Sequence, residues 1–289
     1  MDRYINLFTD YGFKKVFGEE PNKDLLIAFL NELLGERDRV KDLTYLNSEH
    51  LGKTPRERSA VFDLYCTNEQ GEKFIVEVQR VKQKFFKDRS VYYSTFAVQE
   101  QAAKGKDWKY ELKSVYTIGI LDFCFEDSDE EKFHHQVKLM EEETKKVFYD
   151  KLTFIYLEIP KFNKNLAELT SDYERWLYAF KNLHRLKDHP EELEAGIFKR
   201  LVEIAEIARY NESEQRNYQE SLKDYWDLKS AIDTYYEEGK AEGKVEGQQE
   251  KTREIVINGL KQGVDITTIA AMTGLSESEI VKITEKNEE

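Results

Sequence analysis

Hydrophobic positions divide the chain into a first part with mixed periodicity and a second part with helical spacing throughout. The apolar side chains between Asn22 and Leu34 share one helical face, which predicts an amphipathic helix that packs on a core. We expect a long helix over Lys84–Lys104 that ends at Gly105. Beyond residue 165 the pattern predicts three more amphipathic helices, at Tyr173–Leu186, Glu191–Tyr210 and Glu212–Glu238.

Strands are predicted where apolar residues alternate with polar ones or run unbroken. Ser59–Thr67 and Lys73–Val81 flank the turn sequence Asn-Glu-Gln-Gly at 68–71, which is typical of a hairpin. Ser114–Phe123 is almost entirely apolar, as expected of a central strand covered on both faces. Shorter strands are expected at Asp42–Asn47, Phe133–Leu139 and Leu152–Ile159. This order of helices and strands predicts an α/β core.

The predicted elements fall into four parts. They are an α/β core over 1–165, a helical extension over 166–237, a Gly/Glu/Lys repeat over 238–262 and a small helix-turn-helix-like unit over 263–289. The repeat places Gly239, Gly243 and Gly247 on one face of a helix; a flexible charged linker is the alternative, because each glycine costs a helix about 1 kcal/mol. The last unit has the shape of a DNA-reading helix-turn-helix, but Glu277 and Glu279 are unfavourable near phosphate, so a helical cap or oligomerisation element is expected and a DNA reader is the alternative.

The composition excludes several classes of protein. The 289 residues carry a formal net charge of −13, with 40% hydrophobic and 35% charged residues, which is too apolar for a disordered chain. No apolar run approaches the roughly 20 residues of a membrane span, and no secretory signal opens the chain. We therefore expect a cytoplasmic protein with reduced Cys66 and Cys124. The sequence has no glycine-rich phosphate loop, so no nucleotide cofactor is expected.

Two carboxylates in the predicted hairpin are the candidate chemistry. Asp63 lies in the run Val-Phe-Asp-Leu-Tyr and Glu77 lies in Ile-Val-Glu-Val-Gln, so both acids have apolar neighbours. A tight hairpin would place Asp63 opposite Val76, and a one-residue bulge would bring the two acids level. Acids in apolar surroundings are costly unless paired or metal-bound, and carboxylate and carbonyl oxygens suit Mg²⁺. The alternative is that both acids lie on the solvated face of an edge hairpin.

The segment Arg80–Val115 is locally basic. It has nine Lys or Arg residues and four acids, a net charge of +5, whereas the rest of the chain carries −18. The nine are Arg80, Lys82, Lys84, Lys87, Arg89, Lys104, Lys106, Lys109 and Lys113, with aromatic residues between them. A basic helix with aromatic residues beside a carboxylate pair is typical of a surface that binds the phosphate backbone of a nucleic acid close to a metal ion. The alternative is an amphipathic helix whose basic face is solvated.

The pair Asp63…Glu77-Val78-Gln79 resembles the active-site signature of the PD-(D/E)xK nuclease superfamily in its D…ExQ form. The surrounding sequence resembles the Rpn group of recombination-promoting nucleases, which are PD-(D/E)xK nuclease family transposases. The matching pieces are Thr9-Asp10-Tyr-Gly-Phe13-Lys14-Lys-Val-Phe17-Gly18, Arg89-Ser-Val-Tyr92-Tyr93-Ser, and Gly105 with Tyr110 before Val115–Leu121. The resemblance spans about residues 4–285 and is most specific over 1–125.

The resemblance implies a restriction-endonuclease-like core, a mixed sheet flanked by helices, that works as a metal-dependent DNA endonuclease linked to recombination or mobile elements. Asp63 and Glu77 would bind Mg²⁺ (or Mn²⁺) together with the backbone carbonyl of Val78. Gln79 stands where the superfamily has its motif lysine, and Gln can orient water but cannot act as an acid or base.

Other residues are implied in supporting roles. Lys14, Lys82 or a second metal would supply the missing positive charge. Asp10 and Lys14 match the family's N-terminal motif; the alternative for Asp10 is a helix N-cap. The expected DNA contacts are Arg80, Lys82, Lys84, Lys87 and Arg89.

Two other functions stay open at this stage. A non-catalytic interaction protein would keep the nuclease-like core and form homo-oligomers through its C-terminal helices, which the acidic net charge and Gln79 favour. A conventional transposase with an RNase H-like core has less support, because no clear acidic triad or basic DNA-binding domain is present. The retained Asp63 and Glu77 and the basic segment favour the endonuclease.

Overall fold

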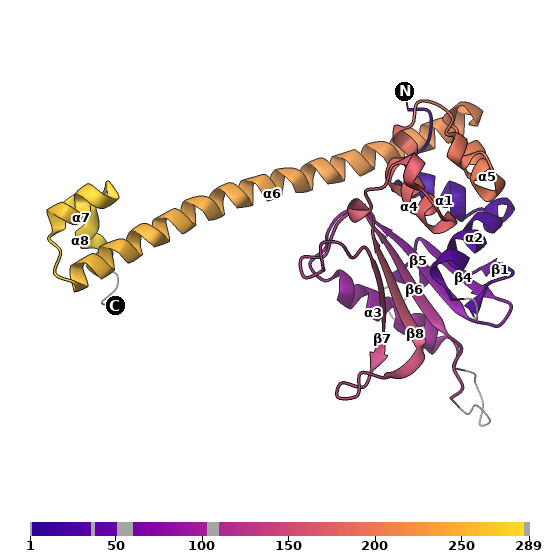
Figure 1. The fold of residues 1–289 in the computed structure, drawn as a ribbon, viewed down its shortest axis with the longest axis horizontal. Coiled ribbons are helices and arrows are strands. Elements are labelled where there is room, and N and C mark those ends of the chain that lie inside the picture. The colour runs from indigo at the N-terminus through magenta and orange to yellow at the C-terminus, as the bar shows by residue number, and fades with distance from the viewer. Residues whose placement is uncertain (1, 36–37, 51–59, 103–109, 286–289) are drawn as a thin grey trace. The chain divides into compact units, whose positions relative to one another are not determined.

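The structure is a computed structural model that describes residues 2–35, 38–50, 60–102 and 110–285. The chain divides into two compact units, Met1–Lys229 and Ser230–Glu289. The helix α6 (Glu212–Lys261) contributes residues to both units (Figure 1). The predicted helices Tyr173–Leu186 and Glu191–Tyr210 lie in the first unit, and the predicted helix Glu212–Glu238 continues past its end at Lys229. The four-part division of the chain stays a prediction.

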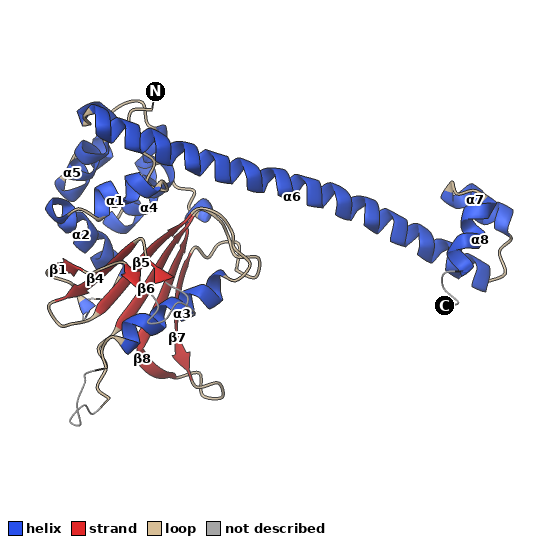
Figure 2. Cartoon of the chain, turned by 180° about the vertical axis from the view of Figure 1, so that it is seen from behind, coloured by secondary structure: helices blue, strands red, loops and turns tan. Residues whose placement is uncertain are grey.

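The first unit is built on one six-stranded mixed sheet (Figure 2). Its strand order is β1 (Leu43–Tyr45), β4 (Leu64–Asn68), β5 (Lys73–Gln79), β6 (Val115–Leu121), β8 (Val147–Glu158) and β7 (His134–Met140). The three strands β5, β6 and β8 are parallel, and the outer strands run antiparallel to their neighbours. The predicted mixed sheet with flanking helices is therefore confirmed.

Helices cover both faces of this sheet. The helix α3 (Phe86–Gln99) joins β5 to β6 and packs on one face. On the other face the large core includes side chains of α1 (Asp10–Phe17), α2 (Lys23–Leu33), α4 (Asp172–Asn182) and α5 (Gly196–Ala205). Alternation along β5 directs Phe74 and Val76 into that large core and Ile75 toward the α3 side. Glu77 and Gln79 have the same parity as Ile75, which places them on the α3 side.

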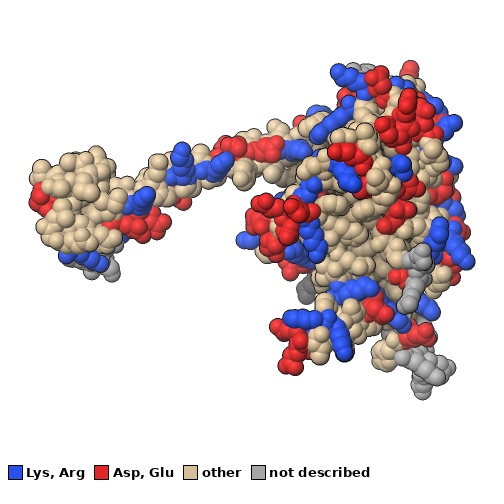
Figure 3. Space-filling view, in the orientation of Figure 1, with Lys and Arg blue, Asp and Glu red and all other residues tan. Residues whose placement is uncertain are grey.

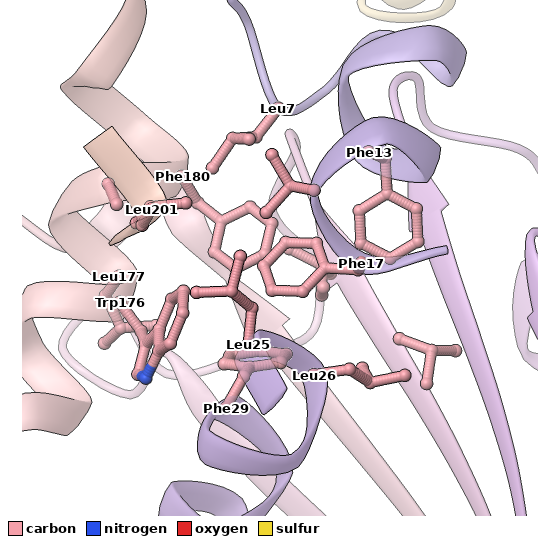
Figure 4. Close-up of a cluster of buried hydrophobic side chains, with 14 of the residues drawn as sticks. Leu7, Phe13, Phe17, Leu25, Leu26, Phe29, Trp176, Leu177, Phe180 and Leu201 are labelled. Carbon is pink, nitrogen blue, oxygen red and sulfur yellow. The ribbon is translucent and has the colours of Figure 1, made fainter. Parts of the chain in front are cut away.

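Aromatic residues from both ends of the first unit form the centre of the large core (Figure 4). Phe17 stacks on Phe180 with ring centroids 5.6 Å apart, and Phe29 contacts Trp176 edge-on at 5.7 Å. All four side chains are fully buried. Because Trp176 and Phe180 lie on α4, the helices after the sheet complete the core that α1 and α2 begin.

Several predicted boundaries are wrong. Ser59–Thr67 is not a single strand: β3 (Ala60–Val61) pairs with β2 (Glu49–His50) in a separate sheet, and β4 begins at Leu64, while Ser59 lies outside the described residues. The predicted helix Glu191–Tyr210 is interrupted, because Gly196 has a φ of +58°. Its 3-10 segments are Glu191–Leu193 and Ile207–Arg209 on either side of α5, and other 3-10 turns are Glu20–Asn22, Ile159–Lys161, Leu166–Glu168 and Leu183–Arg185.

The N-terminal motif forms the helix α1, and its cap is not Asp10. The hydroxyl of Thr9 accepts a hydrogen bond from the backbone N–H of Gly12 at 3.0 Å, which makes Thr9 the N-cap. Asp10 is the first helical residue, so the N-cap alternative for Asp10 is wrong. The predicted helix Lys84–Lys104 is observed as α3, whereas Lys104 and Gly105 lie outside the described residues.

The second unit is helical. The repeat lies within α6, which runs unbroken to Lys261, so the helix alternative describes this segment and the linker alternative is wrong. Two short helices follow, α7 (Ile266–Thr273) and α8 (Glu277–Glu285), separated by a turn in which Gly274 has a φ of +73°. Val256, Ile269 and Ile280 form a small core. No helix in the described part of the chain has both the length and the apolar character needed to cross a membrane.

Candidate active site

The β4–β5 turn sets the register of the two candidate carboxylates. The backbone N–H of Asn68 donates to the Glu72 carbonyl at 3.2 Å, which leaves a three-residue loop, and Gly71 takes a φ of +81°. A left-handed glycine at this position is typical of three-residue hairpin loops. Leu64 consequently pairs with Val76, and the next step of the register brings Asp63 level with Glu77. The predicted pairing of Asp63 with Val76 is wrong by one residue, and no bulge is needed.

Asp63 and Glu77 lie where the regular β4–β5 ladder ends. The N–H of Val78 donates to Asp63 Oδ2 at 2.7 Å, and the N–H of Asp63 donates to Glu77 Oε1 at 3.3 Å. Each carboxylate thus accepts a backbone hydrogen bond from the other strand. A residue's N–H and C=O point to the same side of a strand, so the Val78 carbonyl also faces the side of Asp63. Two carboxylates and one carbonyl converge here.

Burial makes this pair electrostatically costly. Glu77 is only 8% exposed, and β5 lies inside the sheet, so the solvated-edge alternative is wrong. Burial raises the pKa of Asp63 above its usual range, against the opposing effect of the Val78 N–H. Burial and then the charge of Asp63 raise the pKa of Glu77, and the guanidinium of Arg89 opposes that rise. A cation beside both carboxylates would relieve their repulsion.

A cavity of about 720 Å³ opens beside Asp63. Asp10 and Lys14 line it from α1 and form an ion pair of 2.9 Å, and Arg80 lines it from the end of β5. The structure therefore brings both residues of the N-terminal motif to the predicted carboxylate. The cavity wall also includes Glu220 and Asp224 of α6, two acids for which the local sequence gives no signal.

Gln79 and Arg89 are joined directly. Gln79 is 7% exposed, and its Oε1 accepts a hydrogen bond from Arg89 Nη2. The Gln79 Nε2 donates to the carbonyl of Val81 at 3.2 Å. Arg89, expected as a DNA contact, is thus held inside the site. In the sequence, two signals linked Arg89 to the carboxylates: the motif Arg-Ser-Val-Tyr-Tyr and its place in the basic segment.

Two of the predicted DNA contacts are paired with acids of the loop after β6. Lys82 forms an ion pair with Glu126, and Lys87 Nζ lies 2.9 Å from Asp127 Oδ2. In Figure 3, acidic and basic side chains lie next to one another over this loop. Lys84 contacts the ring of Phe85, with its ammonium 5.5 Å from the centroid. The three predicted basic residues Lys104, Lys106 and Lys109 lie outside the described residues.

The carboxylate pair fits a weakly ligated divalent cation better than a protein cage. Among the described residues, no three His, Cys, Asp or Glu side chains are grouped to hold a metal ion. Mg²⁺ commonly keeps several waters and takes only one or two protein carboxylates, with substrate phosphate completing its shell. The buried like charges of Asp63 and Glu77, together with the Val78 carbonyl, match that requirement.

A family model described as PD-(D/E)XK nuclease family transposase matches residues 7–235. This chain belongs to that family. Searches of curated proteins and of solved structures found no match. The match confirms the predicted family, includes every candidate site residue, and ends before the glycine repeat.

Proposed function

We propose that this chain is a metal-dependent DNA endonuclease that hydrolyses phosphodiester bonds and acts in recombination or mobile-element processes. The observation that carries the proposal is the Asp63–Glu77 pair, in register where β4 and β5 meet, with Asp63 lining a cavity that Lys14 and Arg80 also line. Membership of a nuclease family supports DNA as the substrate.

The residues of the site have distinct roles in this proposal. Asp63, Glu77 and the Val78 carbonyl would hold Mg²⁺ (or Mn²⁺), which lowers the pKa of bound water and neutralises charge on the phosphodiester. Lys14 and Arg80 face the cavity and would bind DNA phosphates near the carboxylates. Lys82, Lys84 and Lys87 would contact the backbone farther along, in competition with Glu126 and Asp127.

Plasmid nicking tests this proposal. Wild-type protein should nick DNA with Mg²⁺ or Mn²⁺, and it should be inactive with chelator. Asp63→Asn and Glu77→Gln should each lose cleavage, whereas Glu69→Gln, on the exposed hairpin turn, should match wild type. Full activity in either site variant, with the variant shown to be folded, would contradict the proposed site.

The same assay separates the endonuclease from the non-catalytic alternative. If no divalent cation supports cleavage by well-folded wild type, the protein is an interaction module with a nuclease-like core. We propose that the second unit mediates homo-oligomerisation in either case. Support comes from the exposed side chains of Tyr235 and Tyr236 on α6 and from a small core that buries only a few apolar residues. A cytoplasmic location remains part of this proposal.

A further inference from the structure

Both polar atoms of the Gln79 side chain make hydrogen bonds inside the protein. Its amide nitrogen donates to the Val81 carbonyl and its amide oxygen accepts from Arg89, at a position only 7% exposed. An amide has one oxygen and one NH₂ group, so these two bonds fix its orientation. The protein therefore fixes the orientation of Gln79, whose oxygen faces the guanidinium of Arg89.

Arg89 is held from several sides. Its Nη1 donates to Gln83 Oε1 at 2.6 Å, and its Nη2 donates to Gln79 Oε1. Its guanidinium carbon lies 5.5 Å from the ring centroid of Phe86 and 5.6 Å from that of Tyr93. Two amides and two rings thus restrict a side chain that is otherwise flexible. A guanidinium carries five N–H donors, so donors remain beyond those used by the two amides.

The guanidinium of Arg89 lies on the same side of the sheet as the carboxylate of Glu77. Gln79 and Glu77 project from the same face of β5, and Arg89 lies on the first turn of α3, which packs on that face. The guanidinium also lowers the pKa of Glu77 against the effect of burial, so the two charges attract. A fixed cation at this place is the arrangement that stabilises negative charge developing on a phosphate, because no reorganisation is needed during the reaction.

We propose that Arg89 supplies the positive charge that the superfamily motif carries on its lysine, and that Gln79 is the positioning residue that holds Arg89. The inference rests on the proposed endonuclease function and deepens it. It explains why Gln and not Lys stands at position 79: a lysine there would place a second buried cation against Arg89 and would lose the acceptor that orients it. Arg89 cannot be deprotonated in proteins, so its role is electrostatic and not that of a base.

A charge exchange tests the inference. Restoring the motif lysine alone, Gln79→Lys, should lower kcat. Arg89→Gln should lower kcat by about 10²- to 10³-fold, the usual effect of removing one oriented donor to developing charge. The double variant Gln79→Lys/Arg89→Gln should recover at least tenfold in kcat over either single variant. Arg89→Lys should be intermediate, because an ammonium keeps the charge but not the fork that both amides bind. Arg175→Gln, on α4, controls for the loss of one arginine.

Two readouts besides cleavage distinguish this role from a structural or DNA-binding one. DNA affinity measured with Ca²⁺ should change much less than kcat in Arg89→Gln. Mn²⁺ affinity without DNA should increase in Arg89→Gln, because a competing cation is removed; a merely structural arginine predicts weaker Mn²⁺ binding.

The inference is overturned if Gln79→Lys equals or exceeds wild type, if the double variant shows no recovery, or if Arg89→Gln loses DNA affinity with kcat unchanged. In each of these cases wild type still cleaves and Asp63→Asn does not, so the proposed function stands. If the wild-type protein does not cleave DNA with any divalent cation, both the proposed function and this inference are wrong.

Discussion

Asp63 and Glu77 face each other across the β4–β5 hairpin, and each carboxylate accepts a backbone N–H from the opposite strand, at 2.7 Å to Asp63 Oδ2 and 3.3 Å to Glu77 Oε1. The pair therefore replaces the main-chain ladder at the point where β4 begins. Two backbone hydrogen bonds fix the acids in place, but they do not compensate two buried negative charges. Without a cation the two carboxylates therefore destabilise the folded protein, and a bound cation would offset their repulsion.

That cost predicts a characteristic pH dependence. The folded pKa of Glu77 is raised above its unfolded value, so the unfolded chain loses this proton at lower pH than the native protein. Stability with chelator should therefore fall as pH rises from about 4.3 toward the raised folded pKa. Glu77→Gln should remove the part of this slope that Glu77 contributes, leaving the smaller part from the raised pKa of Asp63, and should stabilise the metal-free protein by about 1 kcal/mol or more at pH 8. Thermal or urea unfolding between pH 5 and 8.5 measures both effects.

A bound divalent cation should oppose the loss of stability of the wild-type protein at high pH. Adding Mg²⁺ or Mn²⁺ should raise the melting temperature of wild type more at pH 8 than at pH 6, because deprotonated carboxylates bind it. Glu77→Gln should show little metal-dependent shift at either pH. If wild type and Glu77→Gln have the same pH slope with chelator, Glu77 is not the group that carries the buried charge.

Gly12 is predicted to be essential for the start of α1. A Cβ at this position would clash with the carbonyl oxygen of Asn6 and lie 2.6 Å from Thr9 Oγ1, the atom that caps the helix. Gly12→Ala should lower the free energy of unfolding by about 2 kcal/mol, because backbone and cap must both move. Urea unfolding measures this. Gly35→Ala is the control: among the described residues an added Cβ meets no atom within 4 Å, so stability should stay unchanged or rise by up to about 1 kcal/mol.

The acidic loop after β6 should weaken DNA binding. Glu126 and Asp127 pair with Lys82 and Lys87, so DNA phosphates must displace two ion pairs to reach these lysines. The double variant Glu126→Gln/Asp127→Asn should bind DNA more tightly, with a salt dependence steeper by up to about 0.9 for each additional phosphate that the protein neutralises.

Titration of affinity against salt with Ca²⁺ measures this effect. Glu142→Gln/Glu143→Gln removes two exposed charges from the β7–β8 turn and controls for net charge alone. An equal increase in affinity in both double variants would mean that the pairing of Lys82 and Lys87 is irrelevant, and that only the overall charge of the protein affects DNA binding.

The sequence indicated which residues lie together in the candidate site better than how they are arranged there. Asp63 and Glu77 were identifiable because acids are rare within apolar strand patterns, and the central strand β6 followed from an unbroken apolar run. The register was missed by one residue, because it depends on whether the turn closes over three or four residues. The Gly71 conformation decides that, and both loop lengths suit the same sequence.

Contacts between distant elements had no local signal. The bond between Gln79 and Arg89 joins a strand to the helix that crosses over from it, and its formation depends on how α3 packs. The acids Glu220 and Asp224 reach the cavity only because α6 returns to the first unit's N-terminal helix. The sequence also left open whether the glycine repeat is helical. The low helix propensity of glycine argues against a helix, whereas the structure shows one.

The glycines of α6 allow a test of self-association in the full-length chain. Gly239, Gly243 and Gly247 lie four residues apart, and a Cβ at each would meet no atom within 4 Å among the described residues. Within one chain, replacing all three by alanine should therefore favour the helix, by about 1 kcal/mol per position. If a second copy packs against this face, three added methyl groups would keep the two backbones apart.

We expect Gly239→Ala/Gly243→Ala/Gly247→Ala to lower the mass per particle in light scattering while helical content by circular dichroism stays the same or rises. A matched triple variant, Lys244→Ala/Gln248→Ala/Gln249→Ala, changes exposed α6 positions without filling the glycine face and should keep the wild-type mass. An unchanged mass in the glycine variant would move any self-association to another surface. Because these residues follow the matched family region, which ends at 235, cleavage should be unaffected in both variants.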